Sequence, residues 1–271
     1  MELLKVTSIQ SPNADFFCRL LTRYISEHLE MPARFVDDIP WPERERLLDA
    51  GEIHVGWICG LPYVWKADQA QPVIELLAAP VMRHPRYQNR PIYFSDVVVH
   101  RESEFKAFAD LRGASWAYNE PHSQSGYNIT RFHLAGLDPP GPMGPTRHYF
   151  GRVVQAGSHL KALQLVLERR VDAAAIDSTV LELELESRPE IGAQLRVVQV
   201  LGPSHIPPWV VSKWVPLGIR EALRSTLLHM HADPAGQTIL ARGQTQRFVQ
   251  VEDRDYDPIR HMARVAQAVR L

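Results

Sequence analysis

The chain lacks the features that mark several classes of protein. Its two cysteines, Cys18 and Cys59, form no C-x-x-C pair, so no metal or redox motif is visible, and the sequence leaves open whether they form a disulfide. No run of roughly 18 apolar residues is present, so no transmembrane helix is expected. The formal net charge is −1, and lysine and arginine are scattered, which argues against nucleic acid or an acidic membrane as a partner.

Motifs for catalysis and cofactor binding are also missing. The sequence contains no P-loop, no G-x-G-x-x-G, no H-E-x-x-H and no G-x-S-x-G, so we expect neither a cofactor nor an enzyme. The N-terminus has no basic segment followed by an apolar segment and a cleavage site. The sequence as it stands therefore predicts a cytoplasmic protein, or a periplasmic one if a signal sequence was removed.

What the chain does contain is typical of a globular α/β protein. It has 271 residues, of which 45% are hydrophobic and 23% charged, enough for one large domain or two modest ones. Apolar runs alternate with segments of helical periodicity, which predicts parallel sheets covered by helices on both faces. Strands are expected at 3–9, 33–36, 53–58, 73–78, 93–99, 115–118, 171–176, 195–201 and 209–211. Helices are expected at 16–29 (capped by Asn13), 42–50, 158–168, from 178, and at 217–230, 234–241 and 257–269, with a Pro/Gly-rich loop at 138–145.

The order of these elements suggests two lobes. The first would comprise residues 1–95 with 203–271, and the second 96–202, with the chain crossing near 93–99 and again near 198–206. Two such lobes would form a ligand cleft and could close by a hinge motion at the crossings. Ligands in open α/β sheets bind beyond the carboxyl ends of the strands, which selects the turns after residues 58, 118 and 176.

The turn after residue 118 has the composition of an anion site. Ser123 and Ser125 stand where the next helix begins, and Gly126 allows a ligand to approach the backbone. A helix N-terminus exposes unpaired N–H groups and a partial positive charge, so it can hold an anion without lysine or arginine. Serine hydroxyls add donors that rotate to fit an oxyanion. An ordinary N-cap gives the same pattern, since serine is a preferred capping residue.

Three more residues lie where such a ligand would bind. The phenol of Tyr63 could donate to a ligand oxygen, although it could equally be a half-buried aromatic in a first helical turn. His159 begins a helix, where the cationic form is disfavoured unless an anion is bound; the alternative is a solvent-facing side chain beside the Ser158 cap. Asp177 could accept a proton from the ligand and repel fully ionised competitors, or it could cap the helix that follows, where Ser178 is the other candidate cap.

Seven segments along the chain form an ordered set: G51-EIHVGWICGLPYV, Y93-FSDVVV, F108-ADLRG, E120-PHSQSGY, G157-SH, R170-VDAAAID and I206-PPW. In this order they resemble the phosphate/phosphite/phosphonate-binding family of ABC-transporter substrate-binding proteins. The resemblance covers most of the chain, and it implies a type 2 periplasmic-binding-protein fold without catalysis.

The resemblance also implies a set of ligand contacts. They fall on the turn after the third strand, on the first crossing between the lobes, and on the start of the helix after residue 122. Two more fall on the start of the helix at 158–168 and on the end of the strand at 171–176. Gln124 is bulkier than the small hydroxyl residue often found at its position in the family. The positions are Tyr63, Tyr93 or Ser95, Ser123, Gln124, Ser125, Gly126, His159 and Asp177.

These observations together predict a solute-binding protein that closes on a small anion, foremost a phosphate- or phosphonate-type oxyanion, for ABC-type uptake or sensing with an ABC permease as its partner. One alternative is a cytoplasmic enzyme of cofactor biosynthesis on the same fold, acting on a small carboxylate or aromatic acid. Another is a cytoplasmic sensor that reports the ligand to a partner protein.

Overall fold

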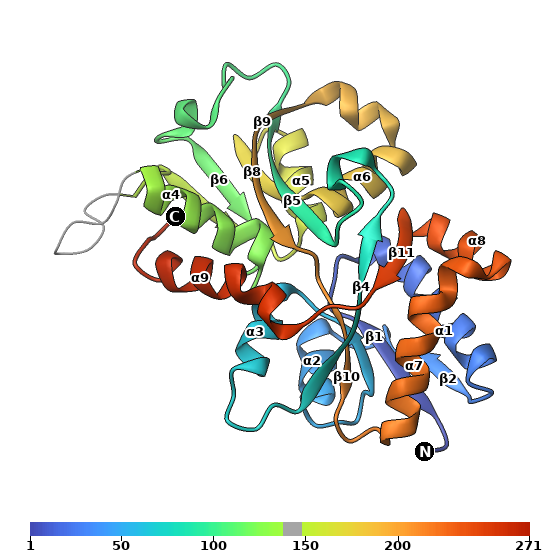
Figure 1. The fold of residues 1–271 in the computed structure, drawn as a ribbon. Helices are drawn as coiled ribbons and strands as arrows, with labels where there is room; N and C mark the ends of the chain where they lie inside the picture. The colour runs from blue at the N-terminus through green and yellow to red at the C-terminus, as the bar shows by residue number, and fades with distance from the viewer. Residues whose placement is uncertain (138–147) are drawn as a thin grey trace. The chain divides into compact units, whose positions relative to one another are not determined.

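A computed structural model describes residues 1–137 and 148–271 and divides them into two compact units (Figure 1). Unit 1 comprises Met1–Ile92 and His205–Asp257, and unit 2 comprises Tyr93–Ser204 and Pro258–Leu271. The chain therefore passes from one unit to the other three times. The loop expected at 138–145 lies outside the described residues.

Unit 1 is built on a sheet that has six strands within the described residues, in the order β11-β4-β10-β3-β1-β2. β1 pairs in parallel with β2 and β3, whereas β10 pairs antiparallel with β3 and β4, and β11 pairs antiparallel with β4. Its strands are β1 (Leu4–Ser8), β2 (Ala33–Phe35), β3 (Val55–Trp57), β4 (Ile74–Met82), β10 (Trp209–Ser212) and β11 (Thr245–Val249). Its helices are α1 (Asp15–His28), α2 (Trp41–Asp49), α3 (Gly60–Ala67), α7 (Leu217–His229) and α8 (Pro234–Arg242).

Unit 2 is built on a sheet that has five strands in the described part of the chain, in the order β7-β6-β8-β5-β9. β6 lies between β7 and β8 and is parallel to both, while β5 is antiparallel to β8. The strands are β5 (Ile92–His100), β6 (Ser115–Tyr118), β7 (Arg152–Gln155), β8 (Ala173–Asp177) and β9 (Leu195–His205). The helices are a π-helical turn (Gln124–Asn128) that continues into α4 (Ile129–Leu137), then α5 (His159–Leu167), α6 (Ser178–Ser187) and α9 (Asp257–Ala266).

The sheet of unit 2 is buried on both faces, because consecutive residues of its strands belong to two separate core clusters. Val97, Trp116 and Ala175 pack into one cluster with α4 and the C-terminal residues, whereas Val98 and Ile176 pack into the other with α5 and α6. Side chains alternate between the faces of a strand, so an apolar run without polar alternation is what a strand covered on both sides requires. This confirms the prediction of helices on both faces for unit 2.

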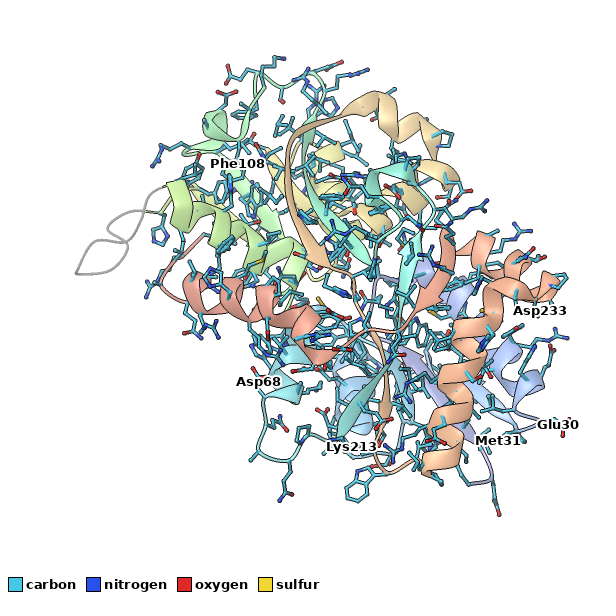
Figure 2. The ribbon with its side chains drawn as sticks, viewed as in Figure 1. Glu30, Met31, Asp68, Phe108, Lys213 and Asp233 are labelled. Carbon is cyan, nitrogen blue, oxygen red and sulfur yellow. The ribbon has the colours of Figure 1, made fainter. Side chains whose placement is uncertain are left out.

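Contacts among four aromatic side chains stabilise the first of these core clusters. Phe108, labelled in Figure 2, packs edge-on against Trp116 with ring centroids 6.1 Å apart and lies 5.5 Å from Tyr149. Trp116 in turn stacks on Phe150 at 4.4 Å. Such pairs add to the free energy gained from burying the rings.

The C-terminal segment belongs to unit 2. Arg131 on α4 donates to the carbonyl of Val269 at 2.7 Å, and Phe132 meets the ring of His261 on α9 with centroids 5.8 Å apart. Figure 1 accordingly shows α9, in red, beside α4, in green. The expected division placed residues 258–271 in the first lobe with 1–95; the structure instead puts this segment in unit 2.

Other differences from the sequence-based prediction have local reasons. The sheets are mixed rather than parallel, because β10 runs antiparallel to β3 and β4 in the sheet of unit 1, and β5 runs antiparallel to β8 in the sheet of unit 2. Asn13 does not cap α1; it lies in a 3₁₀ turn, Pro12–Ala14, and Ala14 occupies the cap position. β7 and β11 were not predicted, and β7 is a mostly exposed strand with no apolar alternation to reveal it.

Two further points were open from the sequence. Cys18 and Cys59 are both free, so they form no disulfide with each other. In the described ranges 1–137 and 148–271, none of the helices has both the length and the apolar character needed to cross a membrane.

The assignment of the C-terminal segment to unit 2 can be checked with one substitution. Val269 is 6% exposed within the first core cluster, so Val269→Asn places an amide where it has no hydrogen-bond partner. We expect this change to cost about 1–3 kcal/mol of local stability. Hydrogen exchange followed by mass spectrometry should show faster exchange in α4, and no change in α1 of unit 1.

The matched control is Arg270→Asn at the exposed neighbouring residue, which should leave hydrogen exchange in both α4 and α1 unchanged. Equal loss of protection in α1 and α4 of the Val269 variant would contradict the assignment.

Candidate functional site

Three parallel strands of unit 2 deliver the candidate residues at their carboxyl ends. β6 leads into the turn that carries Ser123 and Ser125, β7 is followed by the start of α5 at His159, and β8 ends at Asp177. The carboxyl ends of parallel strands meet at one edge of a sheet, which is where ligands of open α/β sheets bind. The sequence predicted this edge from the turns after residues 118 and 176, where two of these strands end.

The turn after β6 forms a tight helical start. Ser123 is the N-cap: its hydroxyl accepts from the N–H of Gly126 at 3.0 Å, and its carbonyl accepts from the N–H of Asn128 at 2.9 Å. The first turn is π-helical, a form that often occurs at functional sites. The N-cap interpretation of the sequence is therefore confirmed for Ser123, and the helix start also leaves the Ser125 hydroxyl to contact other elements.

Gly126 is required by close packing. A Cβ added at this residue would lie 2.0 Å from Oδ1 of Asn119 and 3.0 Å from Cε1 of His159. Any larger side chain would clash with the Asn119 side chain and crowd the ring of His159. The glycine thus allows Ser125 to reach the histidine.

Ser125, His159 and Asp177 form a buried polar cluster. The hydroxyl of Ser125 lies 2.9 Å from Nε2 of His159 and 3.5 Å from Oδ2 of Asp177. The backbone N–H of Asp177 donates to Nδ1 of His159 at 3.4 Å. The three residues are 3%, 7% and 5% exposed, so His159 is not the solvent-facing side chain that the sequence left as an alternative.

Asp177 also caps the helix that follows it. Its Oδ1 accepts from the backbone N–H of Thr179 at 2.8 Å and from the Thr179 hydroxyl at 2.7 Å. The capping interpretation of Asp177 is confirmed, and Ser178 is not the cap; its hydroxyl instead accepts from the N–H of Phe94 at 3.1 Å. One carboxylate oxygen is thus committed to the helix, while the other faces Ser125.

Burial shifts the two titratable groups of this cluster in opposite directions. Loss of hydration lowers the pKa of His159 to about 4, against a smaller opposite effect from the Ala175 carbonyl, so the imidazole is neutral near pH 7. Loss of hydration raises the pKa of Asp177 to about 6, although the hydrogen bonds from Thr179 work against this and Asp96 adds a small repulsion. The cluster therefore contains a neutral imidazole and a carboxyl group that can take up a proton close to neutral pH.

Gln124 does not share this arrangement. Its side chain is completely buried: its Oε1 accepts from Nδ2 of Asn128 at 2.7 Å, and its Nε2 donates to Oγ of Ser204 at 3.2 Å and to Sδ of Met262 at 3.1 Å. Sequence reasoning missed all three partners. Only Asn128 had a local signal, since it stands four residues after Gln124 on the same helical face.

The remaining predicted residues divide between the units. Ser95 is the cross-strand partner of Asp177 in the β5–β8 pair, and both Ser95 and Tyr93 are 1% exposed in unit 2. Tyr63 belongs to α3 of unit 1, where its hydroxyl donates to Asp253 at 2.8 Å and its ring lies 4.7 Å from that of Tyr256. The structure thus brings together Ser95, Ser123, Ser125, Gly126, His159 and Asp177 within unit 2.

Fold and cluster together define a class: an α/β binding protein in two units, with buried hydroxyl groups and a helix start at the edge of a sheet. A family model described as "ABC transporter, phosphonate, periplasmic substrate-binding protein" matches residues 15–256. The chain therefore belongs to this family of transporter substrate-binding proteins, which are not enzymes, and the resemblance found in the sequence is confirmed.

Solved structures support the same fold, the two-lobed type 2 periplasmic-binding-protein fold. A binding protein component of an ABC phosphonate transporter from Pseudomonas aeruginosa has a TM-score of 0.83 and 18% identity, with 98% of this chain and 86% of that chain covered. PhnD1 from Prochlorococcus marinus, in complex with methylphosphonate, has a TM-score of 0.82 and 18% identity, with 99% of each chain covered. A Xanthomonas citri protein bound to ATP has a TM-score of 0.74 and 16% identity, with 98% of each chain covered.

The opposite pKa shifts of His159 and Asp177 predict a specific dependence of stability on pH. A histidine whose pKa falls from 6.5 to about 4 on folding contributes stability that grows as pH rises between those values. A carboxyl group whose pKa rises from 3.8 to about 6 contributes stability that declines as pH rises between those values. In wild type the two contributions oppose each other between about pH 4 and 6.

Substituting one residue should reveal the contribution of the other. Relative to wild type, Asp177→Asn should gain stability as pH rises from about 4 to 6, and His159→Gln should lose it, each by an amount on the order of 3 kcal/mol. Urea denaturation of the ligand-free protein at several pH values measures both changes. The exposed His122→Gln serves as the control. If the free energy of unfolding changed with pH by the same slope in both variants, the two groups would not be buried as described.

Proposed function

We propose that the cluster of Ser123, Ser125, His159 and Asp177 binds a phosphonate or phosphate oxyanion, delivering it to an ABC permease. The observation that carries the proposal is the pairing of hydroxyl donors at a helix start with a buried carboxyl group whose pKa is raised to about 6. Hydroxyl and backbone N–H groups at this position suit the ionised oxygens of such a ligand. The family description supports the role in transport, and the methylphosphonate bound to the Prochlorococcus marinus protein supports the ligand class.

Asp177 gives this site a way to select its ligand. A phosphonate or phosphate that keeps one P–OH group can donate that proton to Oδ2 of Asp177, the oxygen that faces Ser125. Sulfate carries no proton near pH 7, so it would meet an unpaired carboxylate and be repelled. The neutral His159 contributes a directional contact to Ser125 without adding charge.

Tyr63, Tyr93 and Ser95 remain sequence-based predictions as ligand contacts. Ser95 has the best supporting geometry, because its register opposite Asp177 puts both side chains on the same face of the sheet. The periplasm is the compartment that the family description supports for this role.

A thermal-shift screen followed by calorimetry tests the proposal. The panel is phosphate, phosphite, methylphosphonate, aminoethylphosphonate and sulfate, with small carboxylates, aromatic acids and ATP; ATP is included because the Xanthomonas citri protein was solved with it. A ligand at a hundredfold its Kd should add about 2.7 kcal/mol of stability. We expect a phosphorus oxyanion to stabilise the protein and sulfate not to.

Ser125→Ala should weaken binding of that ligand by about 1–3 kcal/mol, because the hydroxyl would meet an ionised oxygen. Thr130→Val is the matched control: Thr130 lies on the same helix, is 0% exposed, and its hydroxyl has no hydrogen-bond partner among the described residues. A response to carboxylates or aromatic acids alone would refute the oxyanion assignment, and a response to ATP alone would redirect it to phosphate esters.

A further inference from the structure

Between Ser123 and Ser125 of the proposed anion site stands Gln124, whose side-chain amide forms hydrogen bonds with residues outside the cluster. Ser125 reaches His159 and Asp177, on α5 and β8. Gln124 instead reaches Ser204 on β9 and Met262 on α9, and it accepts from Asn128 one helical turn later. The first turn of the helix therefore contacts α5 and β8 through Ser125, and β9 and α9 through Gln124.

The amide of Gln124 is well matched to this position. Its NH₂ group has two donor hydrogens, and two acceptors, Ser204 Oγ and Met262 Sδ, lie within 3.2 Å and 3.1 Å of Nε2. Its Oε1 receives the Asn128 amide at 2.7 Å. Gln124, Asn128 and Ser204 are 0%, 2% and 3% exposed. A buried amide with both ends engaged rigidifies what it connects, because releasing either end leaves a polar group unpaired.

The partners of Gln124 occupy places where the chain changes units. Ser204 is the last residue of unit 2 before the chain enters unit 1, and Met262 lies shortly after the chain returns at Pro258. Both belong to unit 2 and are distant from Gln124 in sequence, by 80 and 138 residues. The anion turn is thus fastened to the two segments that end and resume unit 2.

We propose that Gln124 is the positioning residue of the anion site: its buried amide, held by Ser204, Met262 and Asn128, fixes the turn that aims the Ser123 and Ser125 groups at the ligand. The proposal rests on the oxyanion-binding function argued above. It replaces the sequence-based expectation that Gln124 itself contacts the ligand, since the side chain is completely buried and its amide is engaged at both ends.

The test uses variants that leave residues 123–126 intact. Ser204→Ala and Met262→Leu each remove one acceptor of the Gln124 amide, and Gln124→Met removes the amide while keeping similar length. Methylphosphonate affinity is measured by calorimetry. We expect Kd to rise about fivefold for each single acceptor removed and more for Gln124→Met, with Thr130→Val unchanged.

Two readouts separate positioning from a loss of general stability. If the Gln124 amide aims Ser125, then Ser125→Ala should weaken binding less in the Ser204→Ala background than in wild type, so that the two changes are not additive. In the ligand-free protein, NMR-detected hydrogen exchange of the Ser125, Gly126 and Asn128 amides should accelerate in Ser204→Ala and Met262→Leu, but not in Thr130→Val.

The outcomes distinguish this proposal from the proposed function. Additive effects on affinity, or unchanged exchange in the turn of Ser204→Ala and Met262→Leu, would overturn the positioning role even if methylphosphonate binds. If wild type binds no member of the phosphorus panel, the proposed function fails, and the exchange measurement alone decides whether Gln124 anchors the turn. Should Gln124→Met not fold, the two acceptor variants carry the test.

Discussion

The candidate site depends on the removal of water from one histidine and one aspartate. Without burial, His159 would titrate near neutral pH and Asp177 would be ionised at any physiological pH. Burial lowers the pKa of the histidine to about 4 and raises that of the aspartate to about 6. Each shift disfavours the charged form, so His159 is neutral at neutral pH and Asp177 takes up a proton more readily than an exposed carboxylate would. Close packing at Gly126 maintains this burial, because it lets the helix start lie against His159.

The sheet topology explains why these residues meet. β7, β6 and β8 are adjacent and parallel, so the segments that follow them emerge at one edge. The chain supplies a helix start after β6, the Ser158 cap and His159 after β7, and the Asp177 cap after β8. Ser123 and Ser158 cap their helices close to Ser125 and His159, which face the cluster. The carboxylate of Asp177 both caps its helix and faces the cluster. Helix capping and ligand chemistry are therefore not competing explanations here.

Much of this arrangement could be predicted from the sequence, because its signals are local. Apolar strands followed by helix starts identified the turn at Ser123 and the position of Asp177, and the helix start after Ser158 identified His159. The partners of Gln124 could not be found in this way, since Ser204 and Met262 come from segments that no local pattern connects to it. The same reason explains the placement of residues 258–271: a helical pattern predicts α9, but nothing in its periodicity says which unit it packs against.

The proton on Asp177 links the electrostatics of the site to its ligand. At neutral pH the cluster carries one negative charge, because the carboxyl group is mostly ionised above its pKa of about 6 while His159 is neutral. An anion that binds beside it must therefore bring a proton, or raise the pKa of Asp177 further so that the carboxyl takes one from solvent. Either route brings one proton into the site together with the anion. A ligand that already holds a proton has the lower cost, so the proposed site would favour such a ligand, without any lysine or arginine among the contacts described for the cluster.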